Sequence, residues 1–304
     1  MLDFLRQEGI EESIIRRIDD FRSQYPAAVE DEYRISVPKY HYYGTDVWKK
    51  ALTALLAGEN ILLVGPKATG KNVLAENLSA VFRRPEWNVS FYLNTDAASL
   101  IGADTFKDGK VSFRQGPIYK CAARGGFGIL DEINMAKNES LAVLHATLDF
   151  RRIIDVPGYD RIELSPCTRF IATMNYGYAG TRELNEALAS RFMVINMPII
   201  AEENLVKLLR SQFPALKNDF AWQLAGLFED IRKKCDSSEI STKALDLRGL
   251  MSAVSLVQNG LSMGQALELG IINKSFDDFE RQLVADIIAA KISEKLTAAD
   301  IFES

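Results

Sequence analysis

Short apolar runs alternate with segments of helical periodicity between about residue 35 and residue 200. Runs of branched and aromatic residues that end at turn residues predict buried strands. Five such runs occur, at 61–64, 88–93, 128–130, 170–174 and 192–197. The intervening segments predict helices at 47–57, 72–82, 118–124 and 140–150. This alternation favours an α/β fold of three layers, in which helices cover both faces of a five-stranded parallel sheet.

The N-terminal segment, residues 1–34, shows a helical pattern of its own. Between Leu2 and Phe21 the apolar residues recur at helical spacing and charged residues lie between them, and Pro26 ends the segment. We expect a helical extension that packs either on the body of the protein or on a neighbouring subunit.

Two segments interrupt the alternation of strands and helices. Residues 105–113 centre on Asp108-Gly109, and residues 153–164 centre on Pro157-Gly158. Both dipeptides are typical of tight turns between paired strands, so we expect two hairpins inserted into the α/β domain. Such hairpins serve either as plain solvent loops or as surfaces that contact another molecule.

The strand signal ends after Pro198. Residues 201–304 carry stripes of Leu, Ile and Ala at helical spacing, separated by turn residues at Pro214, 236–238, Gly260 and Gly264. We therefore expect three parts: the extension at 1–34, the α/β domain at 35–200, and an all-helical domain at 201–304.

Composition narrows the class of protein. The 304 residues are 47% apolar, as in ordinary soluble proteins, and the formal net charge is -5. That charge argues against a protein that binds nucleic acid, which usually carries a basic excess. The sequence shows no apolar stretch of membrane-spanning length, and its acidic N-terminus lacks the apolar core of a signal peptide. We expect a cytoplasmic protein.

Cysteine and histidine are scarce. The three cysteines, Cys121, Cys167 and Cys235, lie far apart and are most simply reduced thiols. The two histidines are His41 and His145, and the second lies in a helical pattern that favours packing. The sequence therefore offers too few cysteines and histidines to favour a zinc site or a cysteine–histidine hydrolase.

The loop after the first strand carries the strongest chemical signal. A buried strand, a loop bracketed by Gly65 and Gly70, Lys71 and a helix follow one another. Backbone N–H groups in such a loop converge on phosphate oxygens, the helix N-terminus adds positive potential, and the lysine reaches the β- and γ-phosphates. The plain alternative is a glycine-rich turn between a strand and a helix. We expect ATP to contact Gly65, Pro66, Lys67, Ala68, Thr69, Gly70, Lys71, Asn72 and Val73.

Asn72 departs from the usual loop, which ends in Ser or Thr with a hydroxyl on Mg²⁺. An amide oxygen is also a hard ligand. Three roles stay open for Asn72: direct contact with Mg²⁺, contact through a water molecule, or capping of the helix. Slow turnover is a consequence to test.

Two acids follow the third predicted strand. Asp131 and Glu132 come directly after 128–130, at the strand end that faces the ligand crevice of an open sheet. We expect Asp131 to hold Mg²⁺ and Glu132 to polarise the water that attacks the γ-phosphate. The alternative is a solvent-facing acidic turn.

Later positions offer partners for these acids. Asn175 follows the next strand, where an amide suits the orientation of water and the sensing of phosphate, although Asn is also common in turns. Arg191 ends a helical segment before the fifth strand. It suits a trans arginine finger for a neighbouring subunit, with Arg182 as second choice, or a cation that favours a helix C-terminus.

The helical region contains a candidate sensor of the nucleotide. Arg248 lies about two residues into a helix that starts near Asp246, and Lys243 is its rival one turn earlier. A solvated basic surface residue is the alternative for both.

These motifs together resemble an AAA+ ATPase of the MoxR type, nearest the CbbQ/NorQ-like branch. The resemblance covers about residues 35–280 and rests on the blocks 65–72, 128–136, 170–192 and 244–250. It implies that Gly65–Asn72 is the phosphate loop of a P-loop NTPase, that Asp131 and Glu132 are the metal and water acids, and that the helical domain is a lid.

The resemblance also assigns four further residues. Asn175 is similar to the first sensor, Arg191 to the trans finger and Arg248 to the lid sensor. Asn94 looks like the residue that restrains the catalytic glutamate. The hairpins resemble inserts near a ring's central pore. The family implies a hexameric ring that remodels a client protein, often with a von Willebrand A domain partner and often for metal-cofactor insertion.

Three functions compete. The leading one is an ATP-hydrolysing, chaperone-like motor that acts on protein, which the pairing of Glu132, Asn175 and Arg191 favours. Asn72 motivates a second, an ATP-gated assembly module with little turnover. A nucleic-acid motor is the third, and the net charge of -5 counts against it.

Overall fold

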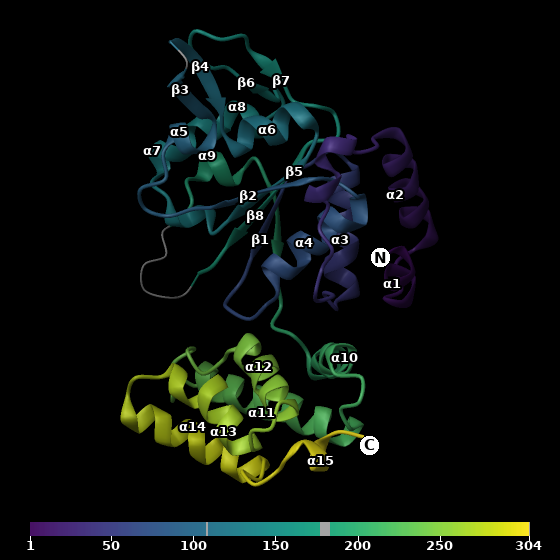
Figure 1. Ribbon diagram of the computed structural model, residues 1–304, viewed down its shortest axis with the longest axis vertical. Coiled ribbons are helices and arrows are strands. Elements are labelled where there is room, and N and C mark those ends of the chain that lie inside the picture. The colour runs from purple at the N-terminus through teal and green to yellow at the C-terminus, as the bar shows by residue number, and fades with distance from the viewer. Residues whose placement is uncertain (108, 177–182, 304) are drawn as a thin grey trace. The chain divides into compact units, whose positions relative to one another are not determined.

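The computed structural model describes residues 1–107, 109–176 and 183–303 (Figure 1). Its contacts divide the chain into two compact units. The first comprises Met1–Pro66 and Gly70–Pro198, and the second comprises Ile199–Ser304 together with the loop residues Lys67–Thr69.

A five-stranded sheet forms the centre of the first unit (Figure 1). Its strands are paired in the order β2-β5-β8-β1-β9, and every pair is parallel. The predicted α/β fold with a five-stranded parallel sheet is thereby confirmed. The strands are β1 (Ile61–Val64), β2 (Glu86–Ser90), β5 (Phe127–Asp131), β8 (Arg169–Met174) and β9 (Met193–Asn196).

Helices cover both faces of this sheet, and alternate residues of β1 point to opposite sides. Ile61 and Leu63 belong to one core cluster, and Leu62 and Val64 belong to the other. The first cluster receives helices α1 (Leu2–Gln7), α2 (Glu12–Gln24), α3 (Thr45–Leu56) and α4 (Lys71–Phe82). The second receives α5 (Ala97–Leu100), α6 (Pro117–Arg124), α7 (Asn138–Leu141), α8 (His145–Leu148) and α9 (Glu186–Ala189).

The N-terminal helices pack on the body of the first unit. The helical pattern is interrupted because Gly9 takes a φ of 78°, a left-handed conformation that glycine adopts without strain. Ile15 and Ile18 of α2 are fully buried in the same cluster as Leu63. A short 3₁₀ helix, Val29–Arg34, follows.

Most predicted elements differ from the structure by one or two residues at an end, and two differ more. The helix expected at 140–150 is three short pieces, α7, a 3₁₀ turn at Ala142–Leu144 and α8. It ends early because the Asp149 carboxylate accepts the backbone N–H of Arg151. The strand expected at 88–93 ends at Ser90, since the backbone N–H of Tyr92 turns to the hydroxyl of Thr95.

Antiparallel strand pairs occur at both expected hairpins. The first joins β3 (Gly102–Lys107) to β4 (Lys110–Gln115), and the second joins β6 (Ile153–Ile154) to β7 (Ile162–Glu163). The hairpins lie at one end of the first unit (Figure 1), where the hydroxyl of Tyr159 donates to the carboxylate of Asp104. The rings of Tyr159 and Phe113 pack with centroids 5.0 Å apart.

The described part of the second unit is built of helices. Gly249 and Gly270 allow α12 and α13 to approach closely, because a Cβ on Gly249 would meet the carbonyl oxygen of Gly270 at 2.0 Å. None of the helices in the described ranges combines the length and apolarity needed to cross a membrane. The helices are α10 (Glu202–Gln212), α11 (Asn218–Asp236), α12 (Leu247–Gln258), α13 (Met263–Gly270), a 3₁₀ turn (Ile272–Lys274), α14 (Asp278–Lys291) and α15 (Ala298–Ile301).

Candidate nucleotide site

The loop between β1 and α4 has the backbone of a strand-to-helix turn. The N–H of Gly65 donates to the carbonyl oxygen of Met174, at 3.3 Å, and so continues the pairing of β1 with β8. Ala68 and Gly70 both lie in the left-handed region, with φ of 62° and 78°. Only glycine adopts that region without cost, and an L-residue there costs about 1–2 kcal/mol. The loop therefore holds strain at Ala68, three residues before α4 begins at Lys71.

Lys71 is the first residue of α4 and is buried. Its Nζ donates to the carbonyl oxygens of Gly65 at 2.9 Å and Pro66 at 2.7 Å. Burial lowers the pKa of Lys71 to about 8, and the negative charges of Asp131 and Glu132 act in the opposite direction. The ammonium group thus lies in the field of the two acids.

Asn72 is exposed at the second position of α4, and Val73 packs against the core. The helix is capped by Gly70 in its left-handed conformation, so the capping role considered for Asn72 is not observed. The two metal-related roles of Asn72 stay open.

Asp131 and Glu132 lie at the carboxyl end of β5, and Thr173 of β8 connects them. The hydroxyl of Thr173 donates to Oδ1 of Asp131, at 2.6 Å, and accepts the backbone N–H of Glu132, at 3.0 Å. Glu132 has a left-handed φ of 54°. A buried hydroxyl therefore links the side chain of one acid to the strained backbone of the next.

Asn175 directs the carboxylate of Glu132. The side-chain Nδ2 of Asn175 donates to Oε1 of Glu132 at 2.8 Å. The backbone carbonyl oxygen of Asn175 accepts a hydrogen bond from Nδ2 of Asn134 at 3.0 Å. Asn94, which the resemblance assigns to the restraint of the catalytic glutamate, lies in an exposed turn after β2. In this structure the amide on Glu132 belongs to Asn175.

Arg191 is held by its own chain. Its Nε donates to the carbonyl oxygen of His145 at 3.1 Å, another guanidinium nitrogen donates to that of Ala187, and a third lies 3.4 Å from Oδ2 of Asp149. The pKa of Asp149 falls to about 2, first because Arg151 bonds to it and then through Arg191. Arg182, the second choice for a trans contact, lies outside the described residues.

Arg248 and Lys243 belong to the second unit, and both side chains are exposed. Arg248 is the second residue of α12, as expected from the position of Asp246 at its N-cap. Asp246 forms an ion pair of 3.5 Å with Lys274. The roles of Arg248 and Lys243 as lid sensors stay predictions.

Thr173 and Asp149 contribute to these clusters, and sequence reasoning missed both. Thr173 precedes Asn175 by two residues, so strand alternation places both side chains on one side of β8. That spacing was a usable signal once Asn175 had been singled out. Asp149 gives no comparable signal, because its contact with Arg191 depends on the early end of α8.

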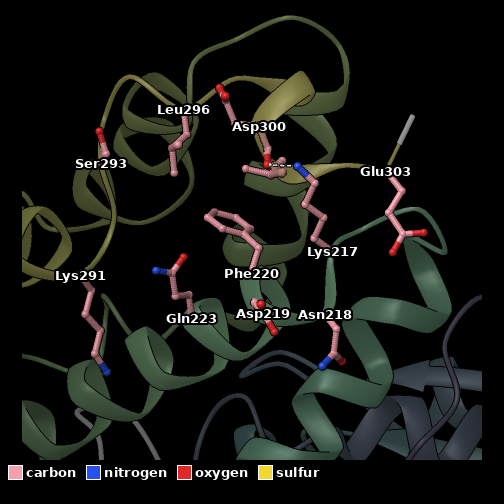
Figure 2. Close-up of a pocket in the computed structure, with 11 residues that line it drawn as sticks. Lys217, Asn218, Asp219, Phe220, Gln223, Lys291, Ser293, Leu296, Asp300 and Glu303 are labelled. Atoms are coloured by element: carbon pink, nitrogen blue, oxygen red, sulfur yellow. Dashed lines mark hydrogen bonds between the residues drawn. The ribbon is translucent and has the colours of Figure 1, made fainter.

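A pocket of about 810 Å³ lies in the second unit, between the start of α11 and the C-terminal segment (Figure 2). Lys217 lines it and donates to the carbonyl oxygen of Asp300 at 2.7 Å, while Lys291 pairs with Asp230 at 2.7 Å. These lysines are thus engaged with the protein itself. No predicted site residue is among the described residues that line this pocket, so the pocket is not part of the candidate site.

Known proteins resemble this chain in sequence over most of its length. The family model described as an AAA domain of the dynein-related subfamily matches residues 60–192, from β1 to the end of the α9 region. Uncharacterized protein YojN of Bacillus subtilis (strain 168) is 32% identical over 93% of this chain and 94% of its own length. Uncharacterized protein SH1500 of Staphylococcus haemolyticus is 33% identical over 82% of this chain and 98% of its own.

A third relative, uncharacterized protein SAOUHSC_01413 of Staphylococcus aureus (strain NCTC 8325 / PS 47), is 34% identical over 82% of this chain and 97% of its own length. The family match covers the loop, the two acids, Asn175 and Arg191 together. The chain belongs to the family of AAA-domain proteins, in the dynein-related subfamily.

Proposed function

We propose that the protein is an ATP-hydrolysing AAA+ motor of the MoxR type, which remodels or activates a partner protein complex. Membership of the AAA-domain family supports an ATP-driven function. The observation that carries the proposal is the contact of 2.8 Å between Asn175 and Glu132 beside the phosphate loop. A protein that only binds ATP has no need for an oriented acid at this place.

Glu132 is suited to act as the general base. An acid that accepts a proton from water in the transition state contributes typically about 10²–10⁴-fold in rate. The bond from Asn175 occupies Oε1, so we assign Oε2 to the attacking water. Because Asn175 lies just past the end of β8, a change in that strand end on nucleotide binding alters the direction of the carboxylate.

The residues present fit ATP with Mg²⁺. The turn at Gly70 brings backbone N–H groups to the start of α4, where the helix dipole favours phosphate, and Lys71 supplies a cation. Asp131 and Asn72 offer the hard oxygen atoms that Mg²⁺ prefers. A metal at this place neutralises charge on the phosphates. The chain's own part is to hold Asp131 in position and to exclude bulk water around Lys71.

The proposal includes a ring of identical subunits, hexameric as in the family that the sequence resembles. Arg191 acts in it as a trans finger, and Arg248, or its rival Lys243, senses the nucleotide from the lid. The family match, which covers Arg191, supports the first role, and the guanidinium must leave its bonds to His145, Ala187 and Asp149 to reach a neighbouring subunit.

The proposed client is a protein. The β3–β4 hairpin carries exposed apolar side chains, with Phe106 77% and Val111 64% exposed, which suit contact with an unfolded or partly folded chain. The resemblance adds a partner with a von Willebrand A domain and a role in metal-cofactor insertion. Co-purification from the native cell, with a Glu132→Gln variant to hold the complex, tests these two points.

Steady-state release of phosphate tests the proposal itself. The wild-type protein hydrolyses ATP in the presence of Mg²⁺, and Glu132→Gln lowers the rate at least about 100-fold, since it removes the base. Glu59→Gln is the matched control, because Glu59 is exposed and precedes the opposite end of β1. Equal inactivity of the wild-type protein and Glu132→Gln would contradict the motor.

A second candidate function is an ATP-gated assembly module with little turnover. The exposed amide of Asn72, in place of a hydroxyl, favours it. The two functions differ in the effect of Glu132→Gln. The motor loses ATP hydrolysis in this variant, whereas the module assembles on binding ATP to the same extent in the wild-type protein and in Glu132→Gln.

A further inference from the structure

We infer that Thr173 is the positioning residue that fixes Asp131 and Glu132 relative to each other and thereby sets the Mg²⁺ requirement of the protein. The inference rests on the proposed function, because it concerns the same two acids. Thr173 touches neither nucleotide nor metal in this scheme and acts through Asp131 and Glu132.

The hydroxyl of Thr173 makes both of its bonds to the acid pair. A threonine hydroxyl has one hydrogen to donate and lone pairs with which to accept. The hydrogen goes to Oδ1 of Asp131, at 2.6 Å, and a lone pair accepts the N–H of Glu132, at 3.0 Å. The side chain is 1% exposed, so water does not replace these bonds easily.

Each of the two hydrogen bonds of Thr173 holds a different part of the acid pair. The bond to Oδ1 stops the carboxylate of Asp131 from rotating, and thus fixes the direction of its second oxygen, which is the ligand proposed for Mg²⁺. The bond to the N–H of Glu132 stabilises a left-handed backbone with a φ of 54°, which carries a steric cost for any residue except glycine. Without Thr173, Asp131 turns and the N–H of Glu132 loses its partner.

Thr173 and Asn175 divide the positioning between them. Asn175 bonds to the carboxylate of Glu132, whereas Thr173 bonds to its backbone and to Asp131. The two residues act from the β8 side on acids at the end of β5, and β5 and β8 are hydrogen-bonded neighbours. Residues behind metal ligands typically change metal affinity or activity by about 10–100-fold when mutated.

Thr173→Val tests the inference, because valine has nearly the same shape and lacks the hydroxyl. We expect the Mg²⁺ concentration for half-maximal hydrolysis to rise about 10–100-fold and kcat to fall. In calorimetry, the gain in ATP affinity that Mg²⁺ gives the wild-type protein shrinks, while ATP affinity in EDTA stays the same, since the loop and Lys71 supply it. Thr173→Ser keeps the hydroxyl, so we expect it to show the wild-type Mg²⁺ dependence of hydrolysis and the wild-type gain in ATP affinity with Mg²⁺.

Thr168→Val is the control for general loss of stability. Thr168 is also fully buried and precedes the opposite end of the same strand, where its hydroxyl bonds to the carbonyl oxygens of Cys121 and Ala122. We expect the Thr168→Val variant to have a lower Tm and an unchanged Mg²⁺ dependence of hydrolysis. A wild-type Mg²⁺ dependence in Thr173→Val, or an equal shift in Thr168→Val, overturns the inference.

The experiments distinguish a failure of the proposed motor function from a failure of the inference about Thr173. A wild-type protein that binds ATP and does not hydrolyse it contradicts the motor, and the calorimetric titrations with and without Mg²⁺ still decide the role of Thr173. A wild-type protein that hydrolyses ATP alongside an unaffected Thr173→Val contradicts only the inference.

Discussion

The side-chain amide of Asn175 donates a hydrogen bond of 2.8 Å to Oε1 of Glu132, so that a residue just past one strand directs an acid just past its neighbour. Glu132 is separately held at its backbone by Thr173. The acid is therefore oriented at two points before any nucleotide binds.

Asn175→Ala should lower kcat by about 10–100-fold and change KM little, because a misdirected base loses much of its catalytic effect. Steady-state kinetics across ATP concentrations measure both constants. Asn94→Ala is the matched comparison, since it removes an exposed amide near the same strand ends. A larger loss of kcat in Asn94→Ala than in Asn175→Ala would show that Asn94, and not Asn175, orients Glu132 for catalysis.

Arg191→Ala should leave ATP binding intact and lower hydrolysis by about 10³-fold or more, as removal of an arginine finger does. If the finger acts between chains, mixing Arg191→Ala with Glu132→Gln partly restores activity, because some interfaces then combine an intact arginine with an intact acid. The rate is measured across mixing ratios. A flat, inactive series at all ratios would assign Arg191 to its own subunit.

The ATP affinity of the wild-type protein should fall as pH rises above about 8. The pKa of Lys71 is lowered to about 8 by burial, and a bound phosphate raises it by favouring the cation. Between these two pKa values the complex holds more protons than the free protein, so binding takes up protons and weakens with rising pH. The phosphate itself titrates near pH 6 and does not contribute there.

Calorimetry in buffers of different ionisation enthalpy measures this proton uptake. Lys71→Arg is the control, because a guanidinium stays charged over the whole range and removes the pH dependence. An affinity that is constant between pH 7 and pH 9 in the wild-type protein would argue against contact between Lys71 and phosphate.

Asn72→Thr should raise kcat by up to about tenfold and lower the Mg²⁺ concentration needed, because it restores the hydroxyl that usually binds the metal. Both are read from the Mg²⁺ dependence of hydrolysis. A slower Asn72→Thr protein would show that the amide of Asn72 is itself the better ligand in this loop.

The sequence predicts most of the sheet well, because β1, β5, β8 and β9 are each short, largely apolar runs, whereas β2 (Glu86–Ser90) mixes polar and apolar residues and its expected bounds are displaced. The run Ile61–Val64 and the loop after it are a local pattern, and so are Asp131 and Glu132 at the end of their strand. The order of the strands places β8 between β5 and β1, so that the ends of β5 and β1 lie on either side of β8, and the parallel pairing follows from the alternation with helices.

The contacts between strands are harder to predict. Thr173 is an ordinary residue for a strand, and although its spacing from Asn175 indicates its side of the strand, the sequence does not show that its hydroxyl reaches Asp131 in the neighbouring strand. The left-handed backbone conformation of Glu132 also cannot be predicted from the sequence, since glutamate rarely adopts it. The break at Gly9 and the early end of α8 likewise depend on single backbone conformations that periodicity does not reveal.

The identity of the nucleotide that stays bound after incubation with MgATP tests the role of Glu132 most directly. Each purified protein is separated from free nucleotide, and the bound nucleotide is identified by chromatography. We predict ADP on the wild-type protein, ATP on Glu132→Gln, and none on Lys71→Ala. ADP recovered equally from the wild-type protein and Glu132→Gln, or nucleotide retained by Lys71→Ala as by the wild-type protein, would contradict a site in which Lys71 holds the phosphates and Glu132 activates water.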